Sequence, residues 1–209
     1  MKKLYVLLVV AVFLLVVQAG ATVIIGQVGS NLPMPNVNYF GAGPQTYGNY
    51  TWSSTNATTQ GGSVYGYTGT YGYLSNGNWD GALGPMAGVN DSFHVYGITD
   101  TMTFAFATPV SWVGGFFNYV PGGSTPTVLT AYWAGGSESY DLTFLTGGGT
   151  NTGEWIRFVG EPSPITSFTM SDNYVGVTGQ SATPEPGTLA LLGSGIVGLA
   201  GFARRKFLL

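Results

Sequence analysis

One stretch decides the fold class: TMTFAFA at residues 101–107. Hydrophobic side chains stand at every second position, so an extended chain would place Met102, Phe104 and Phe106 on one face and the smaller residues on the other. This period of two is typical of a strand with one face in a core. Pro109 then predicts the end of the strand.

Short stretches of similar character lie on both sides of it. They are rich in aromatic and β-branched residues, and Gly and Pro separate them at close intervals. No helical period of useful length occurs between residues 22 and 183. These features predict an all-β domain, an antiparallel β-sandwich or jelly roll. The predicted strands cover residues 50–52, 92–96, 101–107, 111–119, 127–133, 139–145, 155–159, 165–170 and 174–177, and residues 83–91 are expected to form a loop.

The N-terminus has the composition of a signal peptide. Lys2 and Lys3 precede an apolar run over residues 4–17, and Ala19-Gly20-Ala21 offers the small side chains of a cleavage site. Residues 1–21 are therefore predicted to direct export through the secretion machinery and to be removed after Ala21. An uncleaved N-terminal anchor is the alternative, because the apolar run is long.

The C-terminus carries three parts in order: Pro184-Glu185-Pro186, an apolar run over residues 188–203, and the basic cluster Arg204, Arg205 and Lys206. As a helix, the apolar run would be about 24 Å long, shorter than the roughly 30 Å hydrocarbon core of a bilayer. A transmembrane helix over this run would keep the basic cluster on the cytoplasmic side. Residues 22–183 would then lie outside the membrane.

This C-terminal segment, residues 184–209, resembles the PEP-CTERM sorting signal of exported bacterial proteins. The resemblance implies processing by exosortase near Pro184-Glu185-Pro186, inner-membrane anchoring before processing, and a final place on the cell surface or in the extracellular matrix. It also implies a link to exopolysaccharide and biofilm. A plain tail anchor without processing is the alternative. Segments 108–119, 153–155 and 167–171 are also similar to exported domains found ahead of such tails, mostly described as β-sandwiches.

The predicted exported domain, residues 22–183, is acidic and lacks cysteine. Arg157 is its only basic side chain beside eight carboxylates, which gives a formal charge of −7. Nucleic acid is excluded as a partner, because phosphate binding needs clustered Lys and Arg. The absence of cysteine excludes thiolate zinc sites, iron–sulfur clusters and cysteine nucleophiles.

Carboxylates in predicted loops are candidate calcium ligands, since calcium takes six to eight oxygens from carboxylates and carbonyls. The candidates are Asp80, Asp91, Asp100 and Asp172. None of them lies in an EF-hand or a calcium-binding repeat, and Asx-turns are the alternative role for such residues. No other cofactor is predicted.

Aromatic side chains are the candidate groups for stacking on sugars. Trp52 and Trp79 stand in polar, turn-rich surroundings, where we expect more exposure than at the other tryptophans. Tyr65 and Tyr67 share one parity with two further tyrosines of residues 64–74, so a continuous strand would line them up on one face. Packing in the core or against a loop is the role that we favour for all four candidates, and stacking on a sugar is the alternative.

No catalytic constellation is apparent. G-x-S-x-G is absent, His94 is the single histidine, and no pair of carboxylates is marked as catalytic. We therefore expect a non-enzymatic structural or adhesive protein of the cell surface or matrix, with extracellular polysaccharide as a partner. The alternatives are a carbohydrate- or calcium-binding β-sandwich module and a glycan-active enzyme whose carboxylates are brought together by the fold.

Overall fold

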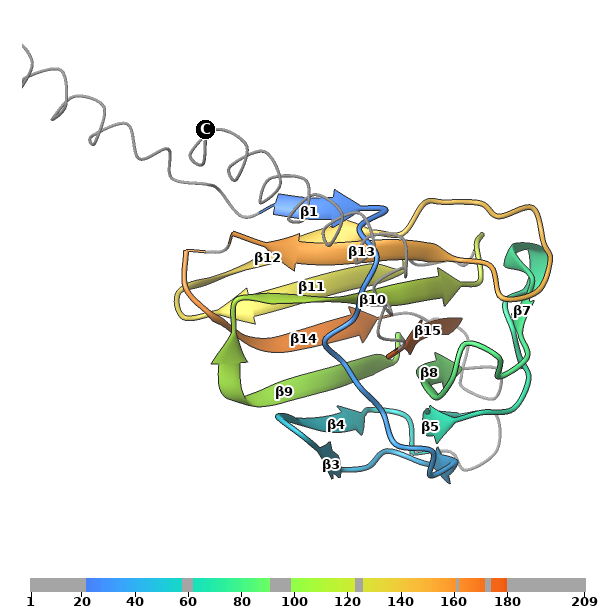
Figure 1. Cartoon of the computed structure of the whole chain (residues 1–209), viewed down its shortest axis with the longest axis horizontal. Helices are drawn as coiled ribbons and strands as arrows, with labels where there is room; N and C mark the ends of the chain where they lie inside the picture. The colour runs from blue at the N-terminus through green and yellow to red at the C-terminus, as the bar shows by residue number, and fades with distance from the viewer. Residues whose placement is uncertain are drawn as a thin grey trace, which may run out of the picture.

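The computed structural model describes residues 22–57, 62–90, 99–122, 126–160, 162–171 and 174–179. These residues form two large antiparallel sheets that share one core, and a short hairpin beside them (Figure 1). The described elements are strands apart from a single turn of 3₁₀ helix, η1 (Leu74–Asn76). The predicted all-β antiparallel fold is confirmed, and the arrangement is consistent with a β-sandwich.

The first sheet has seven strands and contains both ends of the described chain. Every neighbouring pair in it is antiparallel. Its order is β1 (Thr22–Ile25), β13 (Glu154–Val159), β10 (Trp112–Tyr119), β15 (Tyr174–Thr178), β8 (Met86–Asn90), β5 (Val64–Tyr67) and β2 (Tyr39–Phe40).

The second sheet has six strands, and a two-stranded hairpin lies apart from it. The order of the second sheet is β12 (Gly136–Asp141), β11 (Val128–Trp133), β14 (Ile165–Ser171), β9 (Thr101–Val110), β4 (Tyr50–Ser54) and β3 (Gln45–Tyr47). The hairpin pairs β6 (Tyr71–Gly72) with β7 (Asn78–Trp79).

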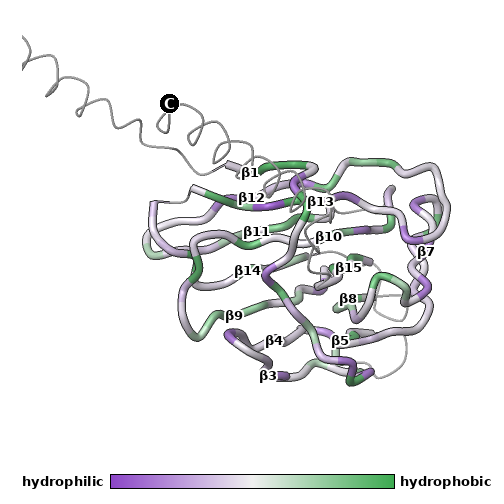
Figure 2. The backbone as a smooth tube through the Cα atoms, viewed as in Figure 1, coloured by the Kyte–Doolittle hydropathy of each residue, from purple (hydrophilic) through white to green (hydrophobic). Residues whose placement is uncertain are grey.

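The main core fills the space between the two large sheets. On β9 the alternation holds as expected, because Met102 and Phe104 are fully buried and Phe106 is 9% exposed. From the other sheet, Val113 and Phe117 of β10 face the same core. Burying an apolar side chain of this size contributes about 1.5–3 kcal/mol, so the alternating strands supply most of the driving force for this packing. Figure 2 shows hydrophobic and hydrophilic residues interspersed along the strands and along the connections between them.

A second cluster covers part of the outer face of the seven-stranded sheet. It comprises Val64, Tyr71, Tyr73, Trp79 and Met86, and it packs against Phe116. Phe116 and Phe117 are neighbours in β10 and therefore point to opposite faces. This cluster holds the hairpin on the sheet. The hairpin in turn positions the site described below.

The chain leaves β1 and crosses the seven-stranded sheet to β2 at the opposite edge (Figure 1). Side chains tie this crossing segment to the sheet. The Asn31 amide donates to the Trp112 carbonyl at 2.6 Å and accepts from the Gly114 N–H at 3.2 Å. The Arg157 guanidinium stacks 4.0 Å from the centre of the Trp112 ring and donates to the Val28 carbonyl at 3.2 Å.

Three expectations about strand limits are wrong. The predicted strand over residues 139–145 stops at Asp141, where β12 ends. Strand β9 continues through Pro109 to Val110, because its ladder to β14 shifts register just there and needs no N–H from the proline. Residues 86–90, expected to form a loop, form strand β8. Their Ala and Gly have little strand propensity, but β15 and β5 supply hydrogen-bond partners on both sides.

Candidate functional site

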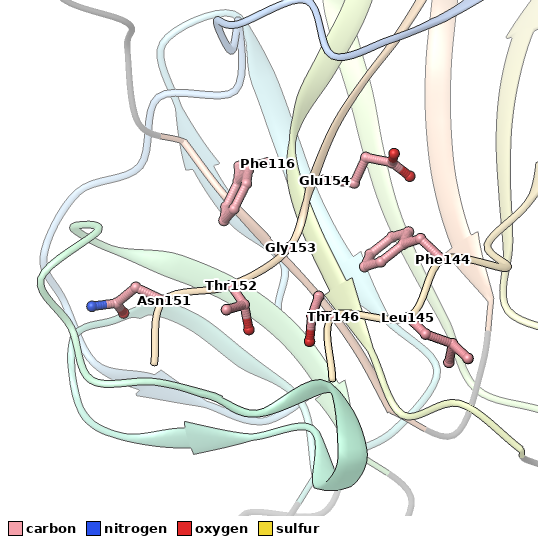
Figure 3. A pocket seen from close by; sticks show the side chains of 8 residues that line it. All are labelled: Phe116, Phe144, Leu145, Thr146, Asn151, Thr152, Gly153 and Glu154. Atoms are coloured by element: carbon pink, nitrogen blue, oxygen red, sulfur yellow. The ribbon is translucent and has the colours of Figure 1, made fainter. Parts of the chain in front are cut away.

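A depression of about 400 Å³ lies where the loop over residues 142–153 passes from β12 to β13. It is open to solvent, and its volume falls in the range of about 300–1,000 Å³ usual for small-ligand sites. Phe116 and Phe144 flank it, with Glu154 on one side of them and two threonines on the other (Figure 3). It is lined by Phe116, Phe144, Leu145, Thr146, Asn151, Thr152, Gly153 and Glu154.

The loop is fixed by the buried side chain of Asn76, at the end of η1. Its amide nitrogen donates to the Phe144 carbonyl at 3.3 Å, and its amide oxygen accepts from the Thr146 N–H at 3.1 Å. The Asn76 carbonyl accepts from the Thr152 hydroxyl at 2.9 Å. These bonds hold both ends of the loop, around residues 144–146 and at Thr152, through one residue. A buried amide that both donates and accepts in this way rigidifies its surroundings.

Two more buried side chains anchor the end of the loop at Thr152. The Asn118 amide donates to the carbonyls of Asn76 and Thr152, at 3.0 Å and 2.9 Å. The Trp79 indole N–H donates to the Thr152 carbonyl at 2.8 Å. Asn118 belongs to β10 and Trp79 to β7, so the loop is secured to the large sheet and to the hairpin at once.

An aromatic row runs from the depression across the outer face of the seven-stranded sheet. Phe116 packs against Trp155 with ring centres 5.2 Å apart, and it stacks on Trp79 at 6.0 Å. The row continues from Trp79 to Tyr73 and from Tyr73 to Tyr71. Phe116 is therefore packed between other rings and has a fixed orientation at the edge of the depression.

Carboxylates give the site a negative character. Burial raises the pKa of Glu154, and burial together with the nearby Glu154 charge raises the pKa of Tyr140. The Ala82 N–H and the Asn151 amide, at 2.9 Å and 2.8 Å, donate to the Asp80 carboxylate and lower its pKa. Asn151 has a left-handed backbone, with φ of 57°, and its amide oxygen accepts from the Asp80 N–H at 3.2 Å.

The lining presents two aromatic rings, two hydroxyls, an amide and a carboxylate. Glu154 is the single carboxylate among the residues that line the depression, whereas glycoside hydrolysis uses a pair. In the ranges that the structure describes, no three His, Asp or Glu side chains gather closely enough to hold a metal ion together.

The expected exposure of two tryptophans is wrong. Trp52 is fully buried in the main core, stacked 5.1 Å from Tyr65, and Trp79 is 2% exposed beneath the loop. Neither ring offers a free face to a sugar. Trp52 belongs to strand β4, where its polar neighbours Thr51 and Ser53 point to the opposite face, so local composition misled the expectation.

Tyr65 and Tyr67 do not share a face. Tyr65 is buried in the main core, whereas Tyr67 is half-buried and packs against the second cluster. Gly66 lies between them with φ of 62°, and the ladder from β5 to β8 shifts register there. A left-handed residue breaks the alternation of a strand. Tyr65 and Tyr67 therefore pack against the two clusters, the role favoured for them over an aromatic platform.

The calcium candidates are separated or lie outside the described residues. Asp80 is exposed and forms an Asx-turn with the Ala82 N–H. Asp100 is buried, and its two carboxylate oxygens accept from the Thr55 hydroxyl and the Asn56 amide, each at 2.9 Å. Asp91 and Asp172 lie outside the described residues.

Several other predicted positions are also outside the described ranges. They are Ala19 and Ala21 of the signal peptide, His94, Pro184-Glu185-Pro186, the apolar run 188–203, and Arg204, Arg205 and Lys206. Among the residues that the structure does describe, no helix is long and apolar enough to cross a membrane.

Sequence reasoning missed the residues that line the depression. One signal for them was present: Gly147-Gly148-Gly149 stands within a long connection between two predicted strands, and long connections often carry function. The packing of Asn76 and Asn118 beneath that connection gives no local sequence signal, because these residues are distant in the chain.

Comparison with known proteins gives one match. The PEP-CTERM protein-sorting motif matches residues 182–206, which contain Pro184-Glu185-Pro186, the apolar run and the basic cluster. Comparison with curated proteins and with solved structures gives no match.

Proposed function

Because the chain carries a PEP-CTERM sorting motif, we propose that its β-sandwich domain is a non-catalytic structural or adhesive component of the cell surface or extracellular matrix. The motif itself supports an exported protein that exosortase processes. After processing, the exported domain has a role of its own. Adhesion to extracellular polysaccharide is the role that we assign to it.

The order of the segments supports this role. The predicted signal peptide, residues 1–21, drives export, and the predicted helix over residues 188–203 holds the chain in the inner membrane until processing near Pro184-Glu185-Pro186. Processing leaves residues 22–183 as the functional domain, on the cell surface or in the matrix.

The single observation that carries the non-catalytic part is the lining of the depression. It combines aromatic rings, hydroxyls, an amide and one carboxylate with a tightly hydrogen-bonded loop. This set of groups binds and orients a ligand, and it does not contain the second carboxylate that a hydrolase of glycans would use.

The sorting step is tested by the intact mass of the protein recovered from its native host, with membrane and extracellular fractions separated. We expect a mass that begins at Thr22 and ends near Pro184-Glu185-Pro186. Replacing these three residues by alanine should leave a chain that still ends at Leu209 in the membrane fraction. D141N, a change at an exposed position of β12, is the control and should be processed normally. A wild-type membrane form that runs to Leu209 would reduce the tail to an anchor.

The adhesive role is tested by deleting the chain from its host. We expect less matrix-bound biomass, restored by the full chain but not by a chain that stops before residue 182. An unchanged matrix in the deletion strain would contradict the adhesive role while leaving sorting intact.

A further inference from the structure

The Phe116 ring is an organised surface at the edge of the depression. It is half-buried, with Trp155 tilted against it and Trp79 stacked on it at 6.0 Å. The face of an aromatic ring carries the negative part of its quadrupole. It therefore attracts polarised C–H groups, such as those that cover one face of a pyranose ring. Because its neighbours already restrain it, Phe116 loses little conformational freedom when a ligand stacks on it.

Hydrogen-bond donors and hydrogen-bond acceptors both surround the Phe116 ring. Glu154 supplies acceptor oxygens for sugar hydroxyls, and the Asn151 amide has donor capacity beyond its bond to Asp80. The Thr146 hydroxyl is buried with no hydrogen-bond partner among the described residues. The left-handed backbone of Asn151 fixes where its amide stands, and such conformations are concentrated at binding sites.

Charge narrows the class of ligand. The depression is lined by one carboxylate and by no basic side chain, and Asp80 lies directly behind Asn151. Arg157, the only basic residue between positions 22 and 183, is engaged with Trp112 and Val28. The carboxylates would repel an anionic polymer, and no basic side chain here would offset that repulsion. A neutral sugar is not repelled.

From these observations we infer that the depression is a binding site for one ring of a neutral polysaccharide, stacked on Phe116 and hydrogen-bonded by Thr146, Asn151 and Glu154. The depression is open, so the ring can belong to a longer chain that continues into solvent on both sides. This inference rests on the proposed adhesive role and specifies the ligand class of that role.

The test measures binding of soluble dextran, mannan and galactan, as neutral polymers, and of alginate, as an anionic one. The full chain is purified from membranes in a neutral detergent, and retention is measured by affinity electrophoresis at fixed salt. F116L removes the ring and keeps an apolar side chain. T146V removes a hydroxyl that has no protein partner, so it leaves the fold intact. F40L, at a 44% exposed position of β2, is the matched control.

We expect at least one neutral polymer to be retained and alginate not to be retained. F116L should weaken the binding about tenfold, the effect of one lost stacking contact. T146V should weaken it a few-fold without changing the melting temperature, and F40L should bind as the wild type does. Equal weakening by F116L and F40L, stronger retention of alginate, or no retention of any neutral polymer would each overturn the inference.

The outcomes separate the glycan site from the adhesive role. If the deletion strain loses matrix but the protein retains no neutral polymer, the site is wrong and the role stands. If the protein binds a neutral polymer through Phe116 but deletion leaves the matrix unchanged, the site stands and the role is wrong.

Discussion

At the scale of single residues, Asn76 organises the site although it lines none of it. N76A would leave the Thr146 N–H without its partner, and it would remove one of the two donors to the Phe144 carbonyl, which keeps the Tyr119 hydroxyl. An unsatisfied buried group costs about 1–3 kcal/mol. We expect a clear loss of stability, measured by urea unfolding. N36A at an exposed position is the control and should change the free energy of unfolding by less than about 0.5 kcal/mol. Equal losses in the two variants would contradict the role of Asn76.

The Glu154 carboxyl makes stability depend on pH. Burial raises its pKa in the folded state, so ionisation is more costly when folded than when unfolded. The resulting penalty is absent below the unfolded pKa, about 4.3, and is complete above the folded pKa. E154Q removes it. We expect E154Q to melt above the wild type at pH 7, with the difference shrinking as the pH falls toward 4. A difference that does not vary with pH would contradict this.

At the scale of elements, Gly66 sets the course of β5. A Cβ atom at this position would collide with the Pro35 carbonyl and lie 2.7 Å from Val37 Cγ2, on a backbone with φ of 62°. G66A should therefore cost about 2–4 kcal/mol, from crowding and left-handed strain together. G72A in β6, where a Cβ would meet nothing within 4 Å, should be nearly neutral. Chemical denaturation compares the two, and a G66A protein as stable as G72A would refute the constraint.

The elements also show what sequence could predict. Strands β9, β11, β13 and β14 follow from their own alternation, because one face of each lies in the core. Strand β8 was missed, since its ladder partners rather than its residues make it a strand. The depression was missed for the same reason: Asn76, Asn118 and Trp79 meet the loop only in the folded chain.

At the scale of the whole molecule, the excess of negative charge makes stability depend on salt concentration. The exported domain carries one arginine against eight carboxylates, so mutual repulsion opposes the compact state. Salt shortens the reach of this repulsion to about 8 Å at 0.15 M. We expect the melting temperature of the full chain in neutral detergent to rise between 10 mM and 500 mM sodium chloride. A fall over that range would mean that attractive pairs outweigh the repulsion.

The position of β15 determines when the seven-stranded sheet can be completed. It is the last of the described strands along the chain, yet it lies between β10 and β8 in the middle of its sheet. Thr178, at its end, is fully buried, and the sorting motif begins at residue 182. The residues between them span at most about 11 Å. In a protein exported from its N-terminus, the seven-stranded sheet can therefore be completed only after almost all of residues 22–178 have crossed the membrane.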